Sequence, residues 1–383
     1  MAAIGGIFNF NGAPCDTRGL VKMSGAMLRR GGKDGRKEAA VLEGAGLFWI
    51  SSNEKNTSAQ GEDGVIAICD GEVYAEYEEG DRSGLSRFFG ETDAQLCLDA
   101  YRRYGVDLGE HISGDFALSV YDKRKKELLL LRMGDGVTPL YYVIRESSIG
   151  FASEISGVLA FFDCPAEVDR ITLRAHVLSR GGQYSGADLY RGIYNVGRMG
   201  GCLCSGLGIS PLGYTKEIGS TETEHTGRTV GGDLACPDEE GMAHLLREIL
   251  HAFGYPQFDC LMPSFLRDIQ RVRETGGAII DGSLCCDIAY SLERRDALSV
   301  LGGYRPLCVP PRTCSVKERE LKKMEKTMLS LFSERDRQKT DFILGEDIES
   351  AILREKNTAR RIRFLGMALQ SVIWYDDMRI TLV

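Results

Sequence analysis

The sequence predicts an α+β protein of two domains, the first rich in β-sheet and the second smaller and α/β to mostly helical. Its 383 residues suffice for two ordinary domains, each with its own core. Short apolar runs broken by glycine-containing turns occupy residues 1–214, whereas apolar residues at helical spacing dominate residues 234–383. Between them, residues 215–233 are polar and rich in Gly and Thr, which predicts a linker.

The first domain is expected to be built mainly of strands. Several candidate strands are apolar on both faces, which is typical of a sheet covered on both sides. The candidates are Ile4–Phe10, Val65–Cys69, Phe116–Tyr121, Leu128–Met133 and Leu140–Ile144.

One helix is expected to pack on this sheet. Thr92 and Gln95 have the spacing of a capping box, which marks a helix start. The apolar residues that follow at helical spacing are Cys97, Ala100, Tyr101 and Tyr104.

In the second domain, Asp238 is expected to cap a helix that ends at Gly254. A helix from Pro263, a short strand at Ala278–Ile280 and a turn at Asp281 then predict one α/β unit. Two later amphipathic helices are indicated by Leu321, Met324, Met328, Leu331 and Phe332, and by Ile362, Leu365, Leu369, Val372 and Ile373.

Composition narrows the classes of partner and compartment. The net charge of -8 and the scattered basic residues argue against nucleic acid. The amino-terminal residues have no signal-peptide pattern, and no apolar run is long enough for a membrane helix, so a cytoplasmic protein is expected. None of the twelve cysteines forms a C-x-x-C pair, so buried or free thiols are expected rather than a zinc site.

Five segments, taken in order, resemble the glutaminase domain of the asparagine synthetase family of class II glutamine amidotransferases. They are IGGIFNFNG, DGEVYAEYE, SGDFALSVYDKRKKELLLLRMGDGVTPLYYV, GFASEISGVLA and DLYRGIYNVGRMGGCLC. The resemblance covers about residues 1–214. It implies a sandwich of two antiparallel sheets between helix layers, the N-terminal-nucleophile (αββα) fold.

The resemblance also places the catalytic residues, and the first of them is changed. The family has a Cys whose thiolate attacks the glutamine amide while its own amine serves as the base. Here Ala2 stands in that position, and an alanine side chain cannot form a thioester. Cys15 lies thirteen residues further on and could not use its own α-amine in this way. The sequence therefore predicts a degenerate glutaminase.

A second change falls on the oxyanion site. In the family motif an Asn side chain and a Gly backbone N–H stabilise the oxyanion, and here these positions hold Asp70 and Gly71. A carboxylate removes a donor and adds charge of the wrong sign, a loss of roughly a hundredfold to a thousandfold in rate. The alternative reading of Asp70 is an ordinary turn residue before glycine.

Three further positions bear on the pocket. The Arg that clamps the glutamine carboxylate in the family would fall near 48–51, where no Arg occurs and Trp49 is expected in the core. The family's R-G-P-D-G loop survives in part as residues 30–35, which begin with Arg30. Asp93 matches the Asp that holds the substrate amino group, although in the first turn of a helix it would also complement the helix dipole.

The second domain resembles a shortened, eroded synthetase domain of the same family. The S-G-G-x-D-S loop that cradles pyrophosphate is absent, and residues 230–234 are read as linker. Asp281, Gly282 and Asp287 match part of a later family motif and are the candidate nucleotide-binding residues, yet one carboxylate holds Mg²⁺ poorly.

Two functions follow from these readings. The first is an asparagine synthetase-related protein without glutaminase or ligase activity, which acts as a binding or regulatory module and pairs with itself or with an active paralogue. Its small-molecule ligand is unknown, and no cofactor is expected. The second is an ATP-dependent amide ligase, of the asparagine or β-lactam synthetase type, that does not use glutamine and would need ATP and Mg²⁺.

Overall fold

The chain divides into two compact units, and each is described by itself. Unit 1 comprises residues 1–163 and 192–221, and unit 2 comprises residues 164–191 and 222–383. The computed structural model describes residues 2–31, 35–51, 57–75, 92–134, 138–161, 166–178, 186–197, 199–214, 236–258, 262–263, 318–344, 350, 352, 354–377 and 380–383.

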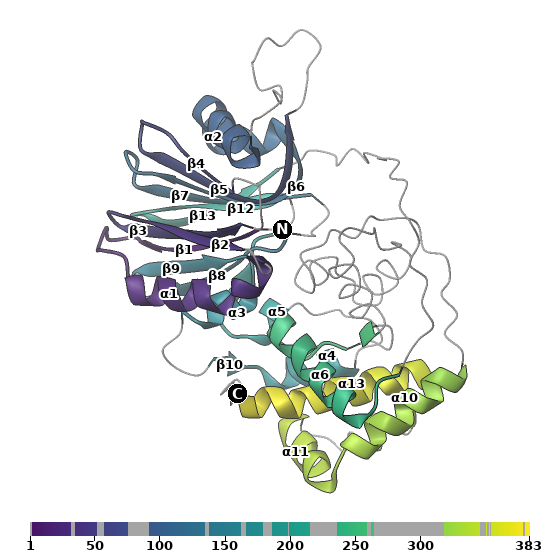
Figure 1. Ribbon diagram of the computed structural model, residues 1–383. Helices are drawn as coiled ribbons and strands as arrows, with labels where there is room; N and C mark the ends of the chain where they lie inside the picture. Colours follow the sequence, from purple (N-terminus) through teal and green to yellow (C-terminus); the bar gives the residue numbers. More distant parts are fainter. Residues whose placement is uncertain are drawn as a thin grey trace, which may run out of the picture. The chain divides into compact units, whose positions relative to one another are not determined.

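Unit 1 contains two stacked antiparallel sheets of six strands each (Figure 1). The first sheet has the order β11 (Ile193–Asn195), β8 (Tyr141–Arg145), β9 (Ser148–Ala152), β1 (Ala3–Asn9), β3 (Ala45–Ser51) and β2 (Arg36–Leu42). The second has the order β13 (Gly208–Gly213), β12 (Gly200–Ser205), β7 (Glu127–Met133), β6 (Ile112–Asp122), β5 (Val65–Ala75) and β4 (Ser58–Gln60).

Helices cover the outer face of each sheet (Figure 1). On the first sheet lie α1 (Thr17–Ala26) and α3 (Ile155–Leu159), with the short helix η1 (Leu28–Gly31) after α1. On the second lies α2 (Asp93–Tyr104), followed by η2 (Gly105–Glu110). This helix–sheet–sheet–helix order is the αββα sandwich that the sequence predicts.

Strand β5 shows why its sequence is apolar on both faces. Ile66 and Ile68 belong to the core between the two sheets. Val65, Ala67 and Cys69 point the opposite way, into the core under α2. Because successive side chains of a strand alternate between faces, a strand in the middle of a layered sandwich must be apolar at both sets of positions.

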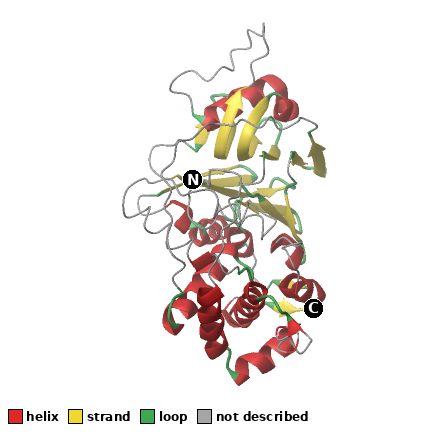
Figure 2. Cartoon of the chain, turned by 90° about the vertical axis from the view of Figure 1, so that its right-hand side faces the viewer, coloured by secondary structure: helices red, strands yellow, loops and turns green. Residues whose placement is uncertain are grey.

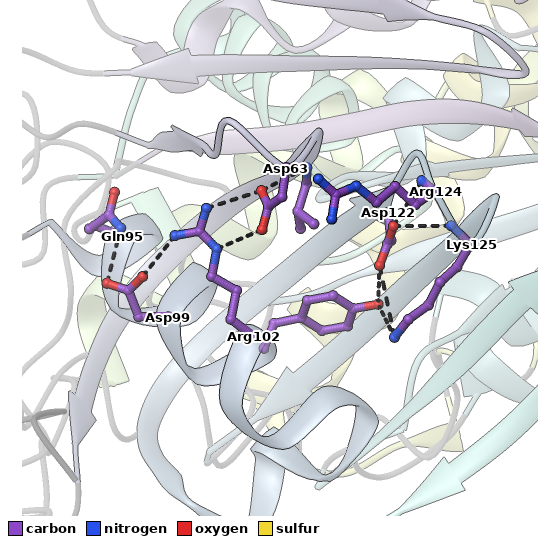
Figure 3. A network of polar contacts seen from close by, with 9 residues as sticks. Asp63, Gln95, Asp99, Arg102, Asp122, Arg124 and Lys125 are labelled. Atoms are coloured by element: carbon purple, nitrogen blue, oxygen red, sulfur yellow. Dashed lines mark hydrogen bonds and ion pairs between the residues drawn. The ribbon is translucent and has the colours of Figure 1, made fainter.

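Helix α2 starts at the residue that its sequence predicts. The last turn of the helix is bonded to residues of the second sheet and its turns. The Thr92 side chain accepts a hydrogen bond from Gln95 N at 3.1 Å. Arg102 holds Asp63 with two hydrogen bonds of 2.9 and 3.0 Å, and Tyr101 donates to the buried Asp122 at 3.4 Å (Figure 3). These contacts fix the helix whose first residue is Asp93.

Unit 2 is mainly helical in its described residues (Figure 2). Its helices are α4 (Arg170–Leu178), α5 (Gly186–Leu189), α6 (Glu239–Phe253), α10 (Glu318–Leu331), α11 (Glu334–Leu344) and α13 (Thr358–Asp377). Strand β10 (Glu167–Val168) pairs in parallel with β14 (Thr381–Leu382).

Helix α13 is the centre of unit 2. Its residues Ile362 to Val372 are all buried. Within that stretch Gln370 donates to Leu246 O of α6 at 3.0 Å and accepts from Gln257 N at 2.7 Å. Trp374 donates to the Tyr190 hydroxyl at 3.0 Å, and this hydroxyl donates in turn to Gly254 O. Polar side chains thus attach the segment after α6 to the core helix.

The helix boundaries predicted around α6 are confirmed. Asp238 caps the helix by accepting from Gly241 N at 2.9 Å, and Gly254 ends it with a left-handed φ of 75°. The amphipathic patterns further on correspond to α10 and α13. The predicted α/β unit lies outside the described residues except for its first residue, Pro263.

The domain boundary differs from the sequence-based one. Residues 164–191, which the sequence pattern assigned to the first domain, pack in unit 2 with the C-terminal helices. Their buried side chains include Leu173, Val177 and Tyr190. None of the described helices combines the length and the hydropathy of a membrane span.

Candidate functional site

Ala2 lies directly before strand β1, which runs between β3 and β9. The neighbouring Ile4 is tied to Ser153, just after β9, because Ile4 N donates to Ser153 Oγ at 3.0 Å and Ser153 N donates to Ile4 O at 2.9 Å. Ser153 Oγ also donates to Asp70 Oδ2 of β5 at 3.2 Å. The start of β1, the Phe151–Glu154 motif and Asp70 therefore meet at one end of the sandwich, although they are far apart in sequence.

Asp70 is completely buried and forms an ion pair. Its Oδ2 accepts a hydrogen bond from Nη2 of Arg30 at 2.8 Å, and the two side chains are 0% and 1% exposed. Nε of Arg30 lies 3.7 Å from Oε1 of Glu154. A carboxylate in such surroundings is tolerated because a guanidinium compensates its charge.

The remaining atoms of this ion pair are enclosed. Oδ1 of Asp70 and Nη1 of Arg30 are buried and have no hydrogen-bond partner among the described residues. The Asp70 carboxylate is therefore paired within the protein, and a carboxylate has no N–H group that could donate to an oxyanion.

The role of Arg30 was not predicted from the sequence. The motifs place Arg30 in the remnant of the family loop and Asp70 at a changed position 40 residues further on, and nothing in the motifs pairs the two. The available signal was a retained Arg and a changed, acidic residue assigned to the same pocket, since an acid that replaces a neutral residue in a buried site needs a cation nearby.

Gly71 has a conformational reason to be glycine. Its φ is 129°, and a Cβ at this position would collide with the carbonyl oxygen of Asp115 on β6. Close approach of two strands thus accounts for this residue without an oxyanion role.

Asp93 contacts β5, the strand that carries Asp70 and Gly71. Its Oδ1 accepts a hydrogen bond from Val73 N at 2.9 Å, two residues beyond Gly71. The carboxylate joins the first turn of α2 to β5, which is a structural use of the residue. Both readings of Asp93 from the sequence remain compatible with this position.

Residues 48–51, where the family's clamping Arg would fall, lie in strand β3. Phe48 is fully buried, and Trp49 is partly buried against the core between the sheets, where its Nε1 donates to Glu38 at 2.9 Å. The sequence predicts Trp49 in the core, whereas the structure places it half-buried at the margin of the core. No side chain of residues 48–51 is cationic, so this segment cannot provide a bidentate anchor for a carboxylate.

Cys15 lies well away from Ala2 along strand β1. A Cβ on Gly46 would collide with its Sγ, and Gly46 is paired with Ile7 on β1. Ile7 lies four residues from Ala3, about 13 Å along the strand. Burial, and secondarily the charge of Asp16, raises the pKa of the Cys15 thiol to about 11. The thiol is therefore protonated near neutral pH and is a poor nucleophile.

The predicted nucleotide-binding residues and the question of a metal site concern other parts of the chain. Asp281, Gly282 and Asp287 lie outside the described residues. Within the described ranges, no cluster of His, Cys, Asp and Glu has the composition of a metal site, and the described cysteines carry free thiols.

Comparison with known proteins agrees with this architecture. Residues 1–202 match the glutamine amidotransferase domain family. A segment of 113 residues is 30% identical to amidase chry2 of Gibberella zeae and covers 29% of this chain and 16% of that protein. A segment of 137 residues is 30% identical to asparagine synthetase [glutamine-hydrolyzing] 3 of Bacillus subtilis and covers 35% of this chain and 22% of that protein.

The matches thus span less than a quarter of the length of these two relatives. Among solved structures, glutamine phosphoribosylpyrophosphate amidotransferase from B. subtilis aligns with a TM-score of 0.38 at 11% identity over 65% of this chain and 56% of that one. That score is too low to add to the argument. The family match covers more than half of the chain, and the two-sheet sandwich accords with it. The chain belongs to the glutamine amidotransferase domain family and is related to its asparagine synthetase members.

Proposed function

We propose that this chain has lost glutamine hydrolysis and acts as a binding or regulatory module built on the glutaminase fold. The observation that supports this proposal best is the buried Arg30–Asp70 ion pair in the place of an oxyanion site. Ala2, at the position of the nucleophile, supports it independently.

The two changes affect different steps of the same reaction. Without a thiolate at position 2 no acyl-enzyme can form. With a carboxylate at position 70, a developing oxyanion would meet negative charge instead of a donor. The framework motifs around them, such as residues 151–154, keep the family's sequence pattern. The Ile4–Ser153 hydrogen bonds and the covering helices complete the packed sandwich. Retained packing together with altered reacting groups favours a scaffold role.

The first experiment measures glutamine chemistry directly. The purified chain is incubated with glutamine and ammonia release is followed, and in parallel it is treated with an electrophilic glutamine analogue and its peptides are analysed by mass spectrometry. A glutaminase-active asparagine synthetase serves as the positive control. We expect no ammonia above buffer and no adduct on residues 2–15. An adduct that disappears in the Cys15→Ala variant would show that Cys15 acts as an alternative nucleophile and would overturn the proposal.

A second experiment separates the two changes. Ala2→Cys restores a sulfur at the family position, while Asp70 still removes the oxyanion donor. We expect ammonia release by this variant to stay at background, because one lost donor alone costs roughly a hundredfold to a thousandfold in rate. Turnover within tenfold of the active control would contradict the proposed effect of Asp70 on the oxyanion site.

The ligase alternative requires its own assay. Its candidate residues lie outside the described part of the chain, so chemistry must decide it. We propose that the chain needs neither ATP nor Mg²⁺, and we expect no exchange of pyrophosphate into ATP with carboxylic acid substrates. Exchange that depends on an added acid would favour an amide ligase.

The proposed module also needs a partner. We propose self-association or pairing with an active paralogue in the cytoplasm. Sedimentation of the chain alone, and mixed with an asparagine synthetase of the same cell, distinguishes these arrangements. A monomer that neither sediments with the synthetase nor alters its ammonia production would contradict both.

A further inference from the structure

We draw no further inference here: the strongest candidate, the buried Arg30–Asp70–Glu154 cluster at the end of the core between the two sheets, belongs to the site already described, and nothing among the described residues shows which ligand would reach its enclosed atoms.

Discussion

At the scale of single residues, Arg30 and Asp70 depend on each other. Each is a charge removed from water, and such a charge is tolerated only when it is paired. Ser153 adds a hydrogen bond to the same carboxylate oxygen. The ion pair therefore explains how an acid can occupy this buried position at all.

Removing one member of the pair should be costly. We expect Arg30→Met to lower the free energy of unfolding by about 3–5 kcal/mol, because it leaves Asp70 buried and uncompensated. The double variant Arg30→Met/Asp70→Leu should be destabilised by less than the sum of its two single variants. Urea denaturation measures all three.

The control for this series is Arg36→Met, on the exposed strand β2. It should change stability by about 0.5 kcal/mol or less. If Arg30→Met costs no more than this control, the ion pair does not contribute as described.

Cys15 provides a pH-dependent test at the same scale. Because the pKa of its thiol is raised to about 11, its thiolate fraction should increase about tenfold per pH unit up to that value. We expect its alkylation rate by iodoacetamide to rise roughly a hundredfold between about pH 8 and pH 10. Mass spectrometry of the peptide that contains Cys15 gives the rate.

The unfolded chain in urea is the reference for Cys15. There the rate should level off above about pH 9, since an unperturbed thiol has a pKa of about 8.5. A folded-state profile that levels off at the same pH would contradict the burial of this thiol.

At the scale of elements, helix α2 is the part whose attachment most affects the candidate site. Its first residue, Asp93, bonds to β5, and its last turn is held through Arg102 and Asp63. The hydrogen bonds from Arg102 lower the pKa of Asp63 below its usual value. The attachment of the last turn of α2 therefore depends on the negative charge of Asp63.

Asp63→Asn tests this attachment. The partly exposed pair should contribute about 0.2–1 kcal/mol. Because the folded-state pKa of Asp63 is lowered, the contribution is present above the unfolded-state pKa and is lost as pH falls through the folded-state value. Wild type should therefore be more stable than the variant at neutral pH, and this difference should vanish in strong acid, as measured by thermal unfolding.

The exposed neighbour Glu62→Gln is the matched control for the acid series. It removes a similar charge one residue away without touching the hydrogen bonds from Arg102. If the Asp63→Asn and Glu62→Gln variants have the same thermal stability at every pH, the Arg102–Asp63 pair does not stabilise α2.

At the scale of the whole molecule, unit 2 is discontinuous in sequence. Residues 164–191 interrupt the strands of unit 1 and supply buried side chains of unit 2, among them Leu173 and Tyr190. The hydrogen bonds of Tyr190 to Gly254 and Trp374 join this segment to the end of α6 and to α13.

A chain cut at the sequence-based boundary should reveal this arrangement. We expect residues 215–383 alone to lack a cooperative thermal transition, because the apolar surfaces that Leu173, Val177 and Tyr190 cover would be left in water. Circular dichroism and calorimetry measure the transition. A chain in which residues 164–191 precede 222–383 should regain it, whereas equal cooperativity with and without the segment would contradict the division into these two units.

The sequence predicted those elements whose signal is local. Strands β1, β5, β6, β7 and β8 and helices α2, α6, α10 and α13 all have an apolar pattern or a cap that can be read in one short window. Strand β2 was missed because it lies at a sheet edge and is mostly exposed, so that burial imposes no alternation on its residues. The pocket residues Ala2, Asp70 and Asp93 were identified because several family motifs occur in the same order along the chain, and not from the type of any one residue.

The glutaminase-like sandwich could be predicted from the sequence alone, since it is recorded in the order and identity of neighbouring residues. The same motifs predict that Ala2 stands where the family has its nucleophilic Cys. Two findings needed the folded structure, namely that Arg30 pairs with Asp70, 40 residues away, and that residues 164–191 pack in unit 2. Both have the same cause. Burial and charge compensation depend on which distant segments meet, and no local pattern of residue types specifies that meeting.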